Sequence, residues 1–289
     1  MRRYALTIAY DGTDFNGWQK QARDAVDESA RALRSVQHTL EQVVISTLHQ
    51  HVSLIGASRT DSGVHAAAQV AAFNTTRDRY GPAGDRIARA LNSRLPDDIV
   101  VLDCRPAHLD FHPVFHCISK GYRYRVFASH DRPLWNRHFV HRVYDPLDLD
   151  AMQRAAALIE GTHDFVAFAS ARHKRLSTVR SVHGCTVTRE DESVIAIDVS
   201  GDGFLYNMVR IIVGTLIEVG KGKKSIEHVR DALELGDRRI AGPTAPAQGL
   251  CLMWIKYPEE AFNPDAPFVP AQRKPWEELL AREQAEAEE

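Results

Sequence analysis

Asp61 is a candidate catalytic residue, because it is a lone carboxylate preceded by Arg59 and followed by the turn residues Ser62 and Gly63. Strand-like apolar runs flank it on both sides, which predicts a tight turn between two strands. A plain hairpin turn is the competing interpretation, since Asp bonds the backbone ahead of it and Gly tolerates positive φ. A carboxylate held in such a turn can act as a nucleophile or as a base. No second carboxylate accompanies it, which argues against glycoside hydrolysis by an acid–base pair.

The string around Asp61, which runs Arg-Thr-Asp-Ser-Gly-Val-His-Ala, resembles the active-site motif of the TruA family of tRNA pseudouridine synthases. Other segments resemble further motifs of that family, in order along the chain: Tyr10–Gln19, Ser35–Gln37, Leu91–Asn92, Leu95–Ile99, Phe111–Phe115, Lys120–Tyr124, Phe204–Arg210 and Gly249–Leu250. Several ordered motifs spread over about 250 residues are far more specific than any one of them.

The resemblance implies an isomerase that converts uridine to pseudouridine at positions 38, 39 and 40 in the anticodon stem-loop of tRNA. This reaction breaks the N1–C1′ bond, turns the uracil and joins C5 to C1′, and it needs no cofactor. Asp61 would be the essential catalytic carboxylate. Attack on C1′ and removal of a sugar proton to give a glycal both remain open as routes. The resemblance also implies a cytoplasmic homodimer whose two subunits both touch the tRNA.

Arg210 is the second residue that the resemblance places in the active site. The stretch from Phe204 to Ile217 is apolar on almost every face, which predicts a buried helix, and Arg210 is its charged side chain. A buried guanidinium without a partner costs several kcal/mol, so it must meet a carboxylate or a phosphate. The resemblance gives it Asp61, whose pKa it would lower. A structural pair with another acidic core residue is the alternative.

Arg59 and Tyr122 complete the active-site residues that the resemblance implies. Arg59 would help hold the target uridine out of the stack, although its spacing alone fits an ordinary surface arginine. Tyr122 would stack on the uracil, whereas Tyr124, two residues further along the same predicted strand, is expected to be core. The histidines at 108, 112 and 116 are four apart, but Pro113 interrupts any helix there, so we expect no metal site.

The net charge of −2 hides an uneven distribution of charge. The tail from Ala271 to Glu289 holds six glutamates against three cations, which leaves the rest of the chain at about +1. The densest cationic segments are Arg172-His-Lys174-Arg175 and Lys221-Gly-Lys223-Lys224. We expect their side chains to hold the tRNA backbone, although solvated loops would have the same composition. Composition therefore permits RNA binding without requiring it.

The hydrophobic pattern predicts the order β-α-β-β-α-β twice, as two tandem ferredoxin-like (RRM-like) α+β units with a ligand cleft between the sheets. The resemblance implies the same arrangement, the pseudouridine synthase fold. We expect the first unit at 1–115 and the second at 116–258, followed by a Pro-rich linker and an acidic tail at 259–289, with a helix from Trp276. In the first unit, a strand at 4–10 and a helix capped by Ser35 should precede strands at 52–60 and 65–74, a helix at 85–93 and a strand at 99–104. The second should contain strands at 117–128, 179–189, 193–199 and 250–256, and helices at 148–159, from about 205 and at 226–235. Gly161 is expected to end the first of these helices.

Two other classes of protein remain as alternatives. A non-catalytic tandem RRM-like RNA-binding protein would share the fold but would not explain the charged residue in an apolar helix or the intact motif around Asp61. A glycosidase-like nucleoside enzyme would need a second carboxylate. No apolar run is long enough to cross a membrane, and the four separated cysteines predict reduced thiols in a cytosolic protein.

Overall fold

The computed structural model describes residues 1–20, 34–76, 84–170, 177–265 and 267. Its contacts divide the chain into two units. The first contains Met1–Ile118 together with the segment that begins at Cys251, and the second contains Ser119–Leu250. Each unit is of the α+β class. The predicted tail helix lies outside the described residues. Within the described part of the chain, no helix is both long enough and apolar enough to span a bilayer.

The first unit has the predicted order of elements from β1 to β4, and a later segment of the chain adds a strand and a short helix. They are β1 (Arg2–Tyr10), α1 (Val36–Leu48), β2 (Ile55–Gly56), β3 (His65–Thr75), α2 (Gly84–Asn92), β4 (Ile99–Ala107), β10 (Leu250–Lys256, from Cys251 on) and the short helix η4 (Glu259–Phe262). The strand order is β4-β1-β3-β10, with β1 antiparallel to both neighbours. The parallel pairing of β10 with β3 assigns to this unit a strand that we expected to close the second one.

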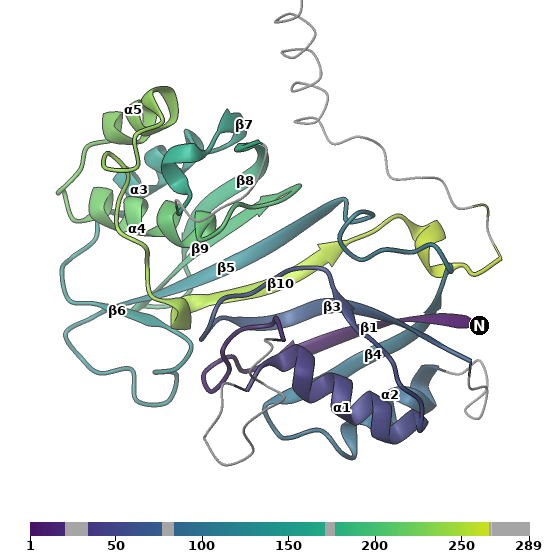
Figure 1. Ribbon diagram of the computed structural model, residues 1–289. Helices are drawn as coiled ribbons and strands as arrows, with labels where there is room; N and C mark the ends of the chain where they lie inside the picture. The colour runs from purple at the N-terminus through teal and green to yellow at the C-terminus, as the bar shows by residue number, and fades with distance from the viewer. Residues whose placement is uncertain (21–33, 77–83, 171–176, 266, 268–289) are drawn as a thin grey trace, which may run out of the picture. The chain divides into compact units, whose positions relative to one another are not determined.

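Two layers of apolar side chains cover the two faces of this sheet. α1 and α2 lie side by side against one face (Figure 1). α1 begins as predicted, because the Ser35 hydroxyl accepts the His38 N–H and its apolar residues at four-residue spacing are buried. The other face carries a core of small side chains around a phenylalanine, namely Ala5, Ala57, Val70, Ala72, Ala107, Phe111 and Ala261.

The predicted strand at 52–60 is wrong for most of its length, because β2 has two residues. Side chains take the place of a neighbouring strand on either side of it. The Leu54 N–H donates to Glu41 of α1, and the Leu54 carbonyl accepts from Gln37 of the same helix. Further along, the amide of Gln69 bonds both the N–H and the carbonyl of Ser58. The backbone groups are therefore satisfied without a ladder.

The second unit is built on a sheet in the order β5-β9-β8-β7, with antiparallel neighbours and β6 added parallel to β5 (Figure 1). Its elements are β5 (Ser119–Ala128), β6 (His141–Val143), α3 (Leu149–Ala157), β7 (Gly161–Asp164), η2 (Val166–Phe168), β8 (Val179–Arg189), β9 (Val194–Gly201), α4 (Met208–Gly220), α5 (Glu227–Leu235) and η3 (Ala247–Gly249). The predicted strands at 117–128, 179–189 and 193–199 are confirmed within a few residues.

Two helix ends in this unit differ from the prediction. α4 begins at Met208 and not near 205, because Asn207 adopts a left-handed conformation with φ of 62°. α3 ends at Ala157, and Gly161, at φ of 110°, begins β7 and does not cap the helix. The short strands β6 and β7 carry too few residues to show an alternating pattern in the sequence.

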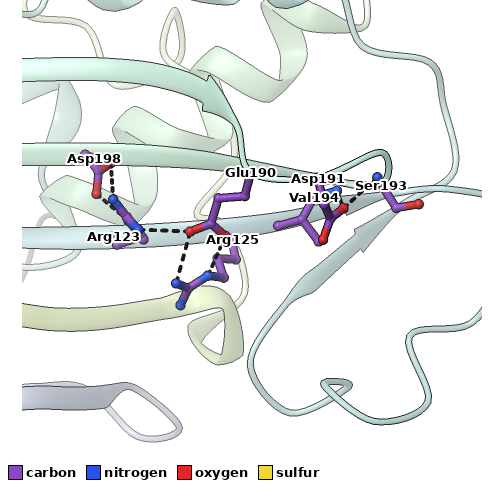
Figure 2. A network of polar contacts seen from close by, with 7 residues as sticks. All are labelled: Arg123, Arg125, Glu190, Asp191, Ser193, Val194 and Asp198. Atoms are coloured by element: carbon purple, nitrogen blue, oxygen red, sulfur yellow. Dashed lines mark hydrogen bonds and ion pairs between the residues drawn. The ribbon is translucent and has the colours of Figure 1, made fainter.

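A network of ion pairs links side chains of β5, β9 and the turn after β8 (Figure 2). Arg123 binds both oxygens of Asp198, its cross-strand partner, at 2.8 and 2.9 Å. Glu190 accepts from Arg123 at 2.9 Å and from Arg125 at 2.7 and 3.1 Å. The hydrogen bond from Arg125 is the main cause that lowers the pKa of Glu190. Bidentate, shared partners make such a network stronger than isolated surface pairs.

We expect Glu190→Gln to lower the free energy of unfolding at pH 7 by about 0.5–1 kcal/mol. A carboxylate whose pKa is lowered by folding stabilises the protein above its unfolded-state pKa, and this stability disappears as the pH falls through the folded-state pKa. The difference between variant and wild type should therefore shrink in acid. Urea titrations at pH 7 and pH 4 measure it, with the exposed Glu192→Gln as the control. Equal effects of the two variants at pH 7 would show that the network adds nothing.

Candidate active site

Asp61 lies on a tight turn, as its sequence predicts. The Val64 N–H donates to the Asp61 carbonyl at 3.1 Å, and Gly63 has φ of 77°, a conformation that favours glycine. β3 starts directly after this turn at His65. The Asp61 side chain is half-buried and that of Arg59 is exposed. The backbone of Asp61 is thus positioned by the turn hydrogen bond and by the strand that follows it.

The segment from Gly12 to Trp18 forms a cradle for this turn. The Trp18 N–H donates to the Thr60 carbonyl at 3.1 Å, and the Phe15 carbonyl accepts from the Gly63 N–H at 3.2 Å. A Cβ at Gly12 would lie 2.1 Å from the Val64 carbonyl oxygen, and one at Gly17 would lie 2.4 Å from that of Thr60. The two glycines are therefore required by close backbone approach.

The buried ring of His65 ties the cradle to β3. Its Nδ1 accepts the Gly12 N–H at 3.0 Å and also lies 3.1 Å from a carboxylate oxygen of Asp11. One nitrogen cannot accept from an N–H and donate to a carboxylate at the same time. The backbone amide always carries its proton, so we assign the Gly12 N–H as the donor to Nδ1. His65 is 3% exposed, which fits a structural part of the motif.

Gln69 is a further positioning residue, fully buried on β3. Its amide donates to the Ser58 carbonyl at 2.6 Å and accepts from the N–H groups of Ser58 and Val70 at 3.2 Å. Ser58 lies three residues before Asp61, so this side chain sets the path of the backbone into the turn.

We expect Gln69→Leu to lower kcat about tenfold and to destabilise the protein, because each buried backbone group that loses its partner costs about 1–3 kcal/mol. The KM for tRNA should stay the same, since Gln69 is not accessible to RNA. Steady-state kinetics and urea unfolding test this, with the exposed Gln42→Leu on α1 as the control. An unchanged kcat in a destabilised Gln69→Leu variant would limit Gln69 to a role in folding.

Tyr122 and Tyr124 lie two apart on β5 but have different surroundings. Tyr124 is fully buried, and its hydroxyl donates to the Pro246 carbonyl at 2.9 Å. Burial raises the pKa of Tyr124 well above its ordinary value. Its prediction as a core residue is confirmed. The ring of Tyr122 keeps 8% exposure and meets Phe204 edge-on, with 5.3 Å between the ring centroids.

Arg210 lies in the first turn of α4, where its guanidinium is fixed by neighbouring oxygens. Nε donates to the Ala245 carbonyl at 2.7 Å and Nη1 to Oδ1 of Asn207 at 3.0 Å. Asn207 is itself held, because its Nδ2 donates to the Ser170 hydroxyl at 2.9 Å. The helix is buried over most of its length as predicted, but Arg210 itself is half-buried, where we expected it to be buried. These contacts orient a planar, permanently charged group.

The loop that carries Ala245 packs closely on α4. A Cβ at Gly214 would lie 1.8 Å from the Pro243 carbonyl oxygen, and the Gly242 N–H donates to the Thr215 hydroxyl at 2.8 Å. The Ala245 N–H returns a bond to the Arg210 carbonyl at 3.0 Å. Gly214, in the middle of a mostly apolar helix, is the one signal in the sequence for this close packing. The sequence gives no signal for the contact with Ala245.

The structure places the candidate residues in both units. Arg59 and Asp61 belong to the first unit, and Tyr122 and Arg210 belong to the second. Of the two basic segments, Lys223 is exposed, while Lys221 lies 3.4 Å from Asp145 and 3.5 Å from Glu218, and Lys224 donates to the Ile240 carbonyl at 2.7 Å. Arg172, Lys174 and Arg175 lie outside the described residues.

The three histidines at 108, 112 and 116 act as turn caps. Each Nδ1 accepts a backbone N–H, from Asp110, from Val114 and from His112 respectively, at 2.8–3.2 Å. Burial is the main cause that lowers the pKa of His112 and of His116. Among the residues that the structure describes, no group of three His, Cys, Asp or Glu side chains could hold a metal ion.

Comparison with known proteins identifies the family of this chain. Residues 6–116 and 155–258 match the model of a family described as tRNA pseudouridine synthase. The tRNA pseudouridine synthase A of Acetivibrio thermocellus is 44% identical over 257 residues, which cover 89% of this chain and 100% of that protein. The protein of the same name from Halalkalibacterium halodurans is 43% identical, over 86% of this chain and 90% of its own length. The chain belongs to the tRNA pseudouridine synthase family and is an isomerase that modifies tRNA.

Proposed function

We propose that this enzyme isomerises uridines 38, 39 and 40 in the anticodon stem-loop of tRNA, with Asp61 as the essential carboxylate. The observation that carries the proposal is the geometry of the Asp61 turn, in which two required glycines and the buried Gln69 fix the backbone around one half-buried carboxylate. Such fixed positioning is what a catalytic group needs and a surface turn does not.

Isomerisation of uridine requires an ionised carboxylate next to the ribose. Asp61 would either attack C1′ as the N1–C1′ bond breaks, or remove the C2′ proton to give a glycal. The freed uracil turns, C5 bonds to C1′, and the proton on C5 leaves to solvent. In the first route a covalent ester to Asp61 forms and breaks again, and in the second Asp61 returns the proton to C2′ as C5 adds to C1′. In both routes N1 takes up a proton in place of the bond that it lost. Both routes begin with the aspartate charged, so a protonated or neutral side chain cannot serve either.

The supporting roles follow from the character of each side chain. Arg210 carries a permanent charge in a fixed orientation, and we propose that it keeps Asp61 ionised during catalysis. Tyr122, mostly buried against Phe204, would stack on the uracil, and the exposed Arg59 would keep the uridine out of the helical stack.

The fold supports the tandem arrangement. The orders β4-β1-β3 and β5-β9-β8, with helices between strands, fit two ferredoxin-like units, and we propose that description for both.

The expected limits at 1–115, 116–258 and 259–289 stay predictions. So do the cytoplasmic location, the homodimer and the hold of both basic segments on the tRNA backbone. A monomeric mass by light scattering at full activity would contradict the dimer.

The target positions are tested by supplying tRNA transcripts in which uridine is retained at one of positions 38, 39 and 40 and replaced by cytidine at the other two. Chemical labelling of pseudouridine followed by primer extension should show a stop at each retained position. Product at none of the three, but elsewhere in the tRNA, would overturn the proposed specificity and leave the family assignment in place.

A further inference from the structure

The segment between β5 and β6 carries several large apolar side chains that are exposed to solvent. We call residues 129–144, with Tyr144 just beyond β6, the β5–β6 arm. Within it Trp135 is 93% exposed, Leu134 61% and Tyr144 58%. Trp135 is the most exposed large apolar side chain in the described part of the protein. Exposed apolar side chains that gather in one place mark a surface for binding.

Internal bonds give the arm a defined shape. Arg137 donates to the Leu134 carbonyl at 3.0 Å, which closes the tip around Trp135. Arg142 ties the base, because its guanidinium donates to the carbonyls of Ser129 and His130 and lies 4.1 Å from the centroid of the Tyr144 ring. These bonds order the backbone on both sides of Trp135, whose indole is exposed.

The charge of the arm is strongly one-sided. The arm contains three arginines, Arg132, Arg137 and Arg142, and one acidic residue, Asp131. Aromatic side chains alternate with arginines along the segment. This combination matches single-stranded nucleic acid, whose bases stack on aromatic rings while cations follow the backbone.

We propose that the β5–β6 arm binds the tRNA substrate, with Trp135 stacked on an unpaired base and Arg132 next to a phosphate. The inference rests on the proposed function, because it names a further part of the surface that holds the same RNA. Trp135 acts in binding and not in the chemical step.

Filter binding of unmodified tRNA measures the contribution of the ring. Trp135→Ala should raise the Kd about 5- to 150-fold, the loss expected for one base–aromatic stack. Trp135→Phe should bind within a few-fold of wild type, since it keeps a ring. The neighbouring Leu134→Ala removes exposed apolar surface without a ring and is the matched control. The kcat at saturating tRNA should be the same in all of these proteins.

The salt dependence of binding measures the phosphate contact. Arg132→Gln should reduce the slope of log Kd against log salt by about 0.7–0.9, the value of one phosphate contact. Arg230→Gln, an exposed arginine on α5, should leave the slope unchanged.

Unchanged affinity in Trp135→Ala together with an unchanged slope in Arg132→Gln would overturn the inference. A Trp135→Ala variant that binds tRNA normally but has a smaller mass by light scattering would also overturn it, because the arm would then be a contact between copies of the chain. If the wild type forms no pseudouridine at positions 38–40 but Trp135→Ala loses tRNA affinity, the proposed function fails and the arm remains an RNA-binding surface.

Discussion

Asp61→Asn is expected to abolish pseudouridine formation while the fold and the affinity for tRNA stay nearly intact. Asn keeps the size and turn-forming ability of Asp but supplies neither a nucleophile nor a base. Loss of such a group lowers kcat by several powers of ten, so turnover should fall below about 1% of wild type. Single-turnover assays at saturating tRNA measure this effect, and circular dichroism checks the fold.

Asp14→Asn is the matched control, because Asp14 is an exposed carboxylate in the neighbouring loop. It should be fully active. Turnover of the Asp61→Asn variant above the limit just given, after exclusion of deamidation back to Asp by mass spectrometry, would remove Asp61 from the chemical step and reduce the turn to a structural feature.

Arg210→Met is expected to lower kcat by about 10²–10³-fold, the usual effect of removing one fixed electrostatic partner. The variant should be more stable than Arg210→Ala, because Met fills the space of the aliphatic stem while Ala leaves a cavity. Steady-state kinetics and urea unfolding of both variants measure the two effects. Arg210→Lys, which keeps the charge but not the planar fork that binds Ala245 and Asn207, should fall between wild type and Met.

The stability of these variants separates a catalytic from a structural role for Arg210. If Arg210→Met unfolds outright, the bonds to Ala245 and Asn207 serve chiefly to hold the loop on α4. If it folds and keeps full kcat, Arg210 has no part in the reaction.

The parts of the fold that follow local rules could be predicted from the sequence. β1, β9 and α1 carry regular apolar periodicity, and Ser35 caps α1 as its position indicates. The turn at Asp61 was predicted for the same reason, since Asp and Gly at those positions have local conformational preferences.

The parts that depend on distant side chains could not be predicted. Residues 52–60 read as a strand, yet Gln37, Glu41 and Gln69 bond that backbone from α1 and β3. The pattern of residues in such a segment does not show whether a neighbouring strand or side chains from elsewhere will bond its backbone. In the same way, the apolar pattern predicted a buried Arg210 on a helix from about 205. The left-handed Asn207, after which α4 begins at Met208, has no signal in that pattern.

The measurement that tests the central claim most directly is release of tritium from tRNA labelled at C5 of uracil. Forming the C5–C1′ bond displaces the hydrogen on C5, so each isomerisation sends one tritium to water. Wild type should release tritium in step with pseudouridine formed, Asp14→Asn should match it, and Asp61→Asn should release none above background. Tritium release by Asp61→Asn at the wild-type rate would contradict the account, as would tight binding of labelled tRNA by the wild type with all the label retained.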